Sequence, residues 1–98
     1  MPIVPNQNVN IAPLLYKNIT TAVTTLVKTG AGTLRSITIN TTTAFTITIY
    51  DNTSAAGAKI ATIAASPAIG SNFYYDVGFT TGLTIVTAGA SDITVCYE

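Results

Sequence analysis

The chain has 98 residues, 48% of them hydrophobic and only 8% charged, and its formal net charge is zero. This length supports one hydrophobic core, and the hydrophobic fraction is too high for a disordered chain. We therefore expect one folded domain. The cations are scattered singly along the chain, whereas nucleic-acid binding needs clustered cations, so we expect no nucleic-acid partner.

The first 13 residues differ in composition from the rest of the chain. Pro2, Pro5 and Pro13 resist helix and ladder formation in a segment rich in Asn and Gln, so we expect an extended N-terminal arm over residues 1–13. Two roles stay open for it, a loosely ordered terminus and an arm that docks on a partner. The candidate docking residues are its apolar side chains Ile3, Val4, Val9 and Ile11.

We expect residues 14–98 to form a single domain, because short runs of alternating apolar and polar residues recur between Gly, Ser, Asn and Pro. The predicted strands cover residues 14–20, 22–28, 33–39, 45–49, 59–64, 72–79, 82–88 and 92–97. About eight short strands without a long amphipathic helix predict an all-β fold. The expected architecture is a single antiparallel β-sandwich, for which a jelly roll is one arrangement.

The runs at 33–39 and 45–49 give the clearest prediction of the core. Large apolar residues alternate with threonine in both, and the polar connection between them predicts a hairpin. Threonine suits a pleated strand and presents an uncharged hydroxyl to water, so we expect Thr46 and Thr48 to face away from the core. The residues expected to be buried are Ile37, Ile39, Phe45, Ile47 and Ile49.

The composition excludes most reaction centres. The chain has no histidine and a single cysteine, Cys96, which excludes Ser-His-Asp and Cys-His sets, His-containing metal sites and an internal disulfide. We therefore expect no enzyme, no cofactor and no metal site, and we expect Cys96 to be a small core residue. A carboxylate pair is the one catalytic alternative. The carboxylates are Asp51, Asp76, Asp92 and Glu98.

Four tyrosines allow two interpretations. Their rings would suit a platform that stacks on sugars, or they would pack at the rim of the core with their hydroxyls at the surface. We favour the rim, because the chain has no tryptophan to strengthen a sugar platform. These tyrosines are Tyr50, Tyr74, Tyr75 and Tyr97.

Three motifs carry a resemblance that spans residues 22–97. They are the start G-x-L-x-S-I-x-I at 32–39, the turn I-Y-D-N-T-S at 49–54 and the turn-and-strand G-L-T-I-V-T-x-G at 82–89. This stretch resembles small all-β structural proteins of tailed bacteriophages. The resemblance implies a non-enzymatic virion protein that binds and stabilises the outside of a phage capsid, as decoration and cement proteins do. It carries over no catalytic residue.

The resemblance also implies a location on the capsid surface of the virion, after synthesis in the host cytoplasm. Together with the low charge and the exposed strand edges, the resemblance predicts a homo-oligomer, and a trimer is favoured. The predicted partner is the major capsid protein. No apolar stretch approaches the roughly 20 residues of a membrane span, so we expect no membrane partner. The alternative function is a head-fibre or tail-associated module that binds a host glycan. An exposed aromatic cluster would favour the glycan module, and a flat apolar patch would favour a cement protein.

Overall fold

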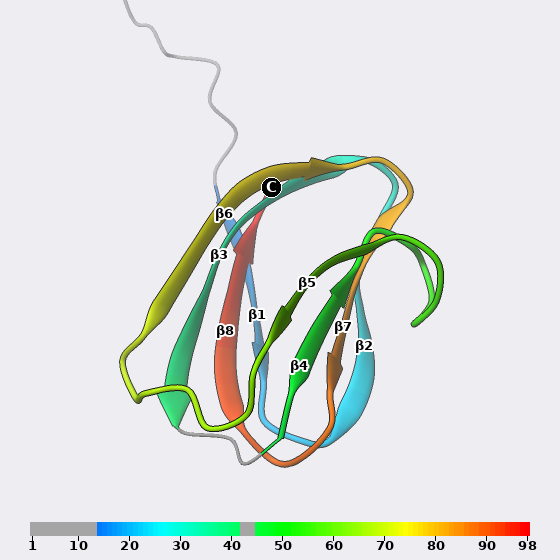
Figure 1. Cartoon of the computed structure of the whole chain (residues 1–98). Coiled ribbons are helices and arrows are strands. Elements are labelled where there is room, and N and C mark those ends of the chain that lie inside the picture. Colours follow the sequence, from blue (N-terminus) through cyan, green and yellow to red (C-terminus); the bar gives the residue numbers. More distant parts are fainter. Residues whose placement is uncertain (1–13, 42–44) are drawn as a thin grey trace, which may run out of the picture.

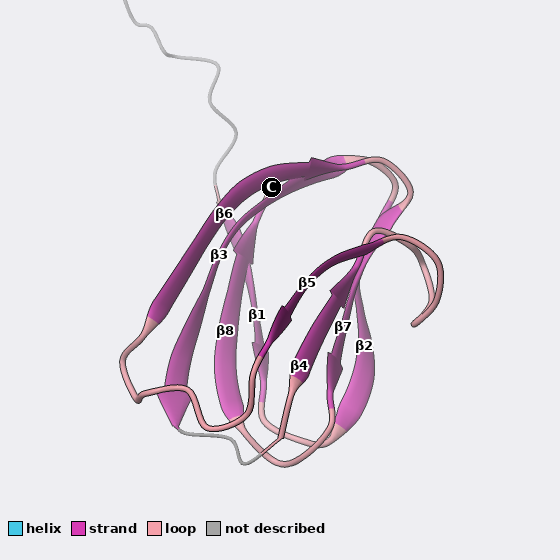
Figure 2. Cartoon of the chain, viewed as in Figure 1, coloured by secondary structure: helices cyan, strands magenta, loops and turns pink. Residues whose placement is uncertain are grey.

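The computed structural model describes residues 14–41 and 45–98, and their regular structure consists entirely of strands (Figure 2). The strands are β1 Leu15–Ile19, β2 Val23–Thr29, β3 Gly32–Thr41, β4 Ile47–Tyr50, β5 Lys59–Ile63, β6 Asn72–Phe79, β7 Gly82–Thr87 and β8 Asp92–Tyr97. Each predicted strand overlaps one of these. The predicted all-β fold is therefore confirmed.

The strands form two four-stranded antiparallel sheets that pack face to face as a β-sandwich (Figure 1). Sheet A has the order β1-β8-β3-β6, and sheet B has the order β2-β7-β4-β5. The pairs β1–β8, β2–β7, β3–β6 and β4–β5 are nested along the sequence. The first four strands thus each pair antiparallel with one of the last four, taken in reverse order. As a result β1 and β6 are the edges of sheet A, and β2 and β5 are the edges of sheet B.

The predicted hairpin between 33–39 and 45–49 is wrong. Strand β3 pairs with β6 and β8 in sheet A, whereas β4 pairs with β5 and β7 in sheet B. Alternation along a strand specifies which side chains face the core. It does not specify the neighbouring strand, and both strands bury their isoleucines in the same core from opposite sheets.

The core fills the space between the sheets. The isoleucines expected to be buried, at positions 37, 39, 47 and 49, are each 0% exposed. Thr46 faces solvent as expected, and Thr48 is half-buried. Phe45 is 52% exposed and does not belong to this core, so that prediction is wrong. It precedes β4, and its ring lies against Gly89, where a Cβ atom would overlap it. The core side chains are Ile19, Leu34, Ile37, Ile39, Ile47, Ile49, Ile63, Phe79, Leu83, Ile85, Ile93 and Val95.

Candidate functional site

The predicted docking arm lies outside the described residues, together with its side chains Ile3, Val4, Val9 and Ile11. Its role stays a prediction. The described chain begins at Leu14, immediately before β1, which is an edge strand of sheet A.

Asp51 fastens the end of β4 to the turn between β6 and β7. Its carboxylate accepts hydrogen bonds from the backbone N–H groups of Thr81 at 2.9 Å and Thr80 at 3.1 Å, and from Gly82 at 3.4 Å. The bonds from Thr81 and Thr80 lower the pKa of Asp51, because they stabilise its charged form. Asp51 therefore holds a turn in place.

Asp92 makes a similar tie across sheet A. Its Oδ1 accepts hydrogen bonds from Asn18 Nδ2 at 2.8 Å and Asn40 Nδ2 at 3.1 Å. The bond from Asn18, followed by that from Asn40, lowers the pKa of Asp92. This carboxylate therefore links the edge strand β1 to β8 and β3.

The remaining two carboxylates share one cation. Arg35 forms ion pairs with Asp76 at 3.1 Å and with Glu98 at 3.0 Å. A bulge places Tyr75 and Asp76 together opposite Arg35, and Asp76 adopts a positive φ of 49° there. All four carboxylates thus make structural ties. Within residues 14–41 and 45–98, no three His, Cys, Asp or Glu side chains are grouped so that they could hold a metal ion.

The surface feature best suited to binding is an apolar seam where the edge strands β1 and β2 diverge. Four apolar side chains of β1, of β2 and of the residue before β1 are roughly half exposed. They are Leu14 at 52%, Leu15 at 49%, Val23 at 41% and Leu26 at 48%. Two of them line the groove between the strands, and the other two precede its lining residues on β1. We call these four residues, with the groove between the two strands, the β1–β2 seam.

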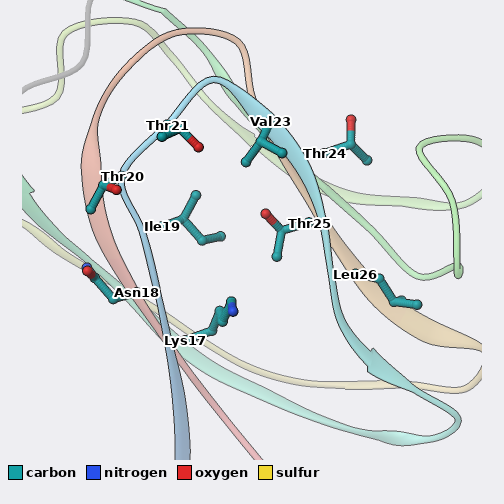
Figure 3. Close-up of a pocket in the computed structure, with 9 residues that line it drawn as sticks. All are labelled: Lys17, Asn18, Ile19, Thr20, Thr21, Val23, Thr24, Thr25 and Leu26. Atoms are coloured by element: carbon teal, nitrogen blue, oxygen red, sulfur yellow. The ribbon is translucent and has the colours of Figure 1, made fainter.

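The groove in the seam has a volume of about 420 Å³ and is lined by residues 17–21 and 23–26, most of which are polar. In Figure 3 the side chains of Lys17, Ile19 and Thr25 lie between the two ribbons, while those of Thr24 and Leu26 project to the opposite side of β2. Among the described residues, β1 pairs only with β8 and β2 only with β7, so within this part of the chain each has one edge without a strand partner. Apolar side chains and unpaired backbone edges therefore occur together here, as at surfaces that contact other proteins.

The structure does not assemble the four predicted tyrosines into one platform. Tyr75 and Tyr97 pack against the core, and burial raises the pKa of Tyr75. Tyr50 is half-buried, so the expected rim position fits these three residues. Tyr74 is instead 74% exposed on the outer face of sheet A.

Sequence reasoning missed a second exposed ring on that face, Tyr16, which is also 74% exposed. Alternation along β1 could have found it, because Ile19 faces the core and Tyr16 has the opposite parity. Cys96 lies on the same outer face, half-buried between Tyr16 and Ser36 in the sheet register. It is not a core residue, so that prediction is wrong.

Comparisons with protein-family models, with curated proteins and with solved structures found no match. The described part of the chain contains no helix suited to crossing a membrane. The candidate site is therefore assigned from its own geometry.

Proposed function

We propose that this chain is a non-enzymatic virion structural protein that binds and stabilises the outside of a phage capsid. The observation that carries the proposal is the β1–β2 seam, where half-exposed Leu15, Val23 and Leu26 lie on strands with open edges. Completing the burial of a half-exposed leucine contributes about 1 kcal/mol, so several such residues support a specific contact.

The strand order supports the proposal. Four nested strand pairs in two four-stranded sheets are the arrangement expected of a jelly roll, which recurs in viral capsid and lectin domains. A fold alone does not determine a function. It does agree here with the resemblance to phage structural proteins.

The low charge supports it as well. With only 8% charged residues, broad surfaces of the sandwich can meet a neighbouring subunit without desolvating many ions. We propose a homotrimer as the bound form, with the seam as the contact between copies, and the major capsid protein as the partner of the trimer. The arm at residues 1–13 would provide a contact between the trimer and the capsid.

Co-sedimentation with capsids assembled from the cognate major capsid protein tests this function. The wild-type chain should sediment with the capsids, and Leu26→Glu should reduce the bound fraction by breaking the trimer. The matched control is Thr62→Glu on the exposed surface of β5, which should bind as the wild type does. If the wild-type chain stays in the supernatant, or if both variants bind equally well, the proposal is wrong.

A further inference from the structure

Two exposed aromatic rings face solvent on the outer face of sheet A, and neither lines the β1–β2 groove. They belong to a row that crosses all four strands and consists of the successive register partners Tyr16, Cys96, Ser36 and Tyr74. Both tyrosines are 74% exposed, and the side chains between them are small. Three strand spacings of ~4.8 Å separate the two tyrosine backbones by ~14 Å.

A second, fully polar row runs parallel to the first, two residues along each strand. It consists of Asn18, Thr94, Thr38 and Asn72. Hydrogen bonds fix these side chains: Thr38 Oγ1 donates to Asn72 Oδ1 at 2.6 Å, and Asn18 Nδ2 donates to Asp92 at 2.8 Å. Side chains held in this way lose little further entropy when a ligand binds.

The charges on this face select against an anionic ligand. Arg35 is its cation and is already paired with Asp76 and Glu98. Asp92 adds a further carboxylate beside the polar row. A nucleic acid or a sulfated polymer would meet more negative than positive charge here.

We propose that the outer face of sheet A binds a linear, uncharged oligosaccharide. The apolar faces of two separate sugar rings stack on Tyr16 and Tyr74, since a tyrosine ring combines an apolar body with a polar end. The sugar hydroxyls form hydrogen bonds with the amides and hydroxyls of the row from Asn18 to Asn72. The small side chains of Cys96 and Ser36 leave the path between the two rings open.

This site does not depend on the β1–β2 seam or on capsid binding. The polar row shares Asn18 with the lining of the groove, but neither tyrosine lines it. Substitutions at the seam residues Val23 and Leu26, which belong to sheet B, leave both rows in place. Failure of one proposal would therefore leave the other standing.

Backbone NMR of the full chain, titrated with four uncharged hexasaccharides, tests the proposal. The probes are the hexamers of β-1,4-glucose, β-1,4-N-acetylglucosamine, α-1,4-glucose and α-1,6-mannose, and a heparin hexasaccharide is the anionic control. At least one neutral hexamer should shift the amide signals of both rows, while heparin should leave them unchanged. Tyr16→Ala and Tyr74→Ala should each weaken binding about five- to tenfold.

Two control variants make the test specific. Tyr74→Phe should retain most of the affinity, because the ring remains, and Leu26→Ala at the seam should bind as the wild type does. Both tyrosines are largely exposed, so their substitution should leave the fold intact, as an unchanged spectrum of the other strands would verify. The proposal is overturned if no neutral hexamer shifts either row at millimolar concentration. It is also overturned if heparin binds equally well, or if the tyrosine variants bind normally.

Discussion

The two open sides of the sandwich differ in the side chains that they expose. On one side, β1 and β2 present the half-exposed Leu15, Val23 and Leu26. On the other side, the exposed residues of β5 and β6 are mostly polar, and Lys59, Thr62 and Asp76 are among them, with the exposed ring of Tyr74 as the exception. Exposed polar and charged residues are how sheet edges avoid pairing with other chains. The difference supports the proposal that β1–β2 contacts another chain, whereas the polar residues of β5 and β6 disfavour strand pairing at those edges.

Backbone irregularity does not account for this difference. Strand β2 has a register shift between Leu26 and Lys28, and β6 has one at Tyr75 and Asp76, so each side carries a bulge. Since bulges occur on both sides, the exposed side chains are what distinguish them.

The largest expected effect comes from the core that both sides share. Ile47 is 0% exposed in the middle of sheet B, and Ile47→Ala should lower the free energy of unfolding by ~2–5 kcal/mol through lost burial and a residual cavity. Urea unfolding measures this. Thr62→Ala on the exposed surface of β5 is the control and should change stability by less than about 0.5 kcal/mol. Equal losses for the two variants would mean that the core is misplaced.

The alternation of large apolar residues with threonine predicted the buried isoleucines at positions 37, 39, 47 and 49. Short alternating runs bounded by Gly, Ser, Asn and Pro predicted all eight strands. Neither pattern predicted the partner of β3 and β4, because pairing is settled by contacts between residues far apart in sequence. Phe45 illustrates a second limit. Phe45 has the same parity as Ile47, but it precedes β4 and packs on Gly89. The alternation between core and solvent therefore begins only after Phe45.

The candidate sites were harder to predict than the core. Exposed Leu26 and Val23 look like core residues in the sequence, and only the sheet order shows that they lie at an edge. Tyr16 and Tyr74 are 58 positions apart in the numbering of the chain, and the sheet register alone aligns them in one row.

The second-largest effect is expected on the self-association of the chain. Val23→Lys places a charge in the seam and should weaken self-association at least about tenfold, because a buried unpaired charge costs more than the roughly 1.4 kcal/mol that a tenfold change requires. Light scattering over a concentration series would show the lower mass. Thr62→Lys on β5 should behave as the wild type. A wild-type chain that is monomeric at high micromolar concentration would contradict the proposed trimer.

Acid should weaken the two carboxylate ties. The pKa values of Asp51 and Asp92 are lowered from 3.8 in the folded chain, so the folded state binds fewer protons than the unfolded state. Their contribution is therefore fully present above about pH 4 and is lost as the pH falls through the lowered pKa values. Urea unfolding from pH 7 to pH 2 should show this loss in the wild type.

Substitutions separate the two ties. Asp51→Asn and Asp92→Asn should each remove part of the decrease in the free energy of unfolding at low pH. Asn18→Ala should reduce the part that belongs to Asp92, because the hydrogen bond from Asn18 is the larger cause of the lowered pKa of Asp92. Only the Asp92 tie reaches β1, so its loss should loosen the seam side of the sandwich. Identical pH profiles for the wild type and both Asp variants would contradict these assignments.

The smallest expected effect on stability comes from removing residues 2–12. If these residues act as an arm rather than as part of the sandwich, the thermal unfolding of the isolated chain should stay nearly unchanged while capsid binding weakens. Calorimetry and co-sedimentation measure the two quantities. Loss of the fold would make the segment part of the core, and undiminished capsid binding would make it dispensable.

Hydrogen exchange of the backbone amides in the two edge pairs tests the central claim most directly, which is that the β1–β2 seam is a contact between copies of the chain. Exchange is compared between a dilute sample and a concentrated one in which the copies associate. We predict slower exchange in Leu15–Ile19 and in Val23–Thr29 of the concentrated sample, and no change in Lys59–Ile63 or Asn72–Phe79. Protection confined to β5 and β6, or association without any protection of β1 and β2, would contradict the claim.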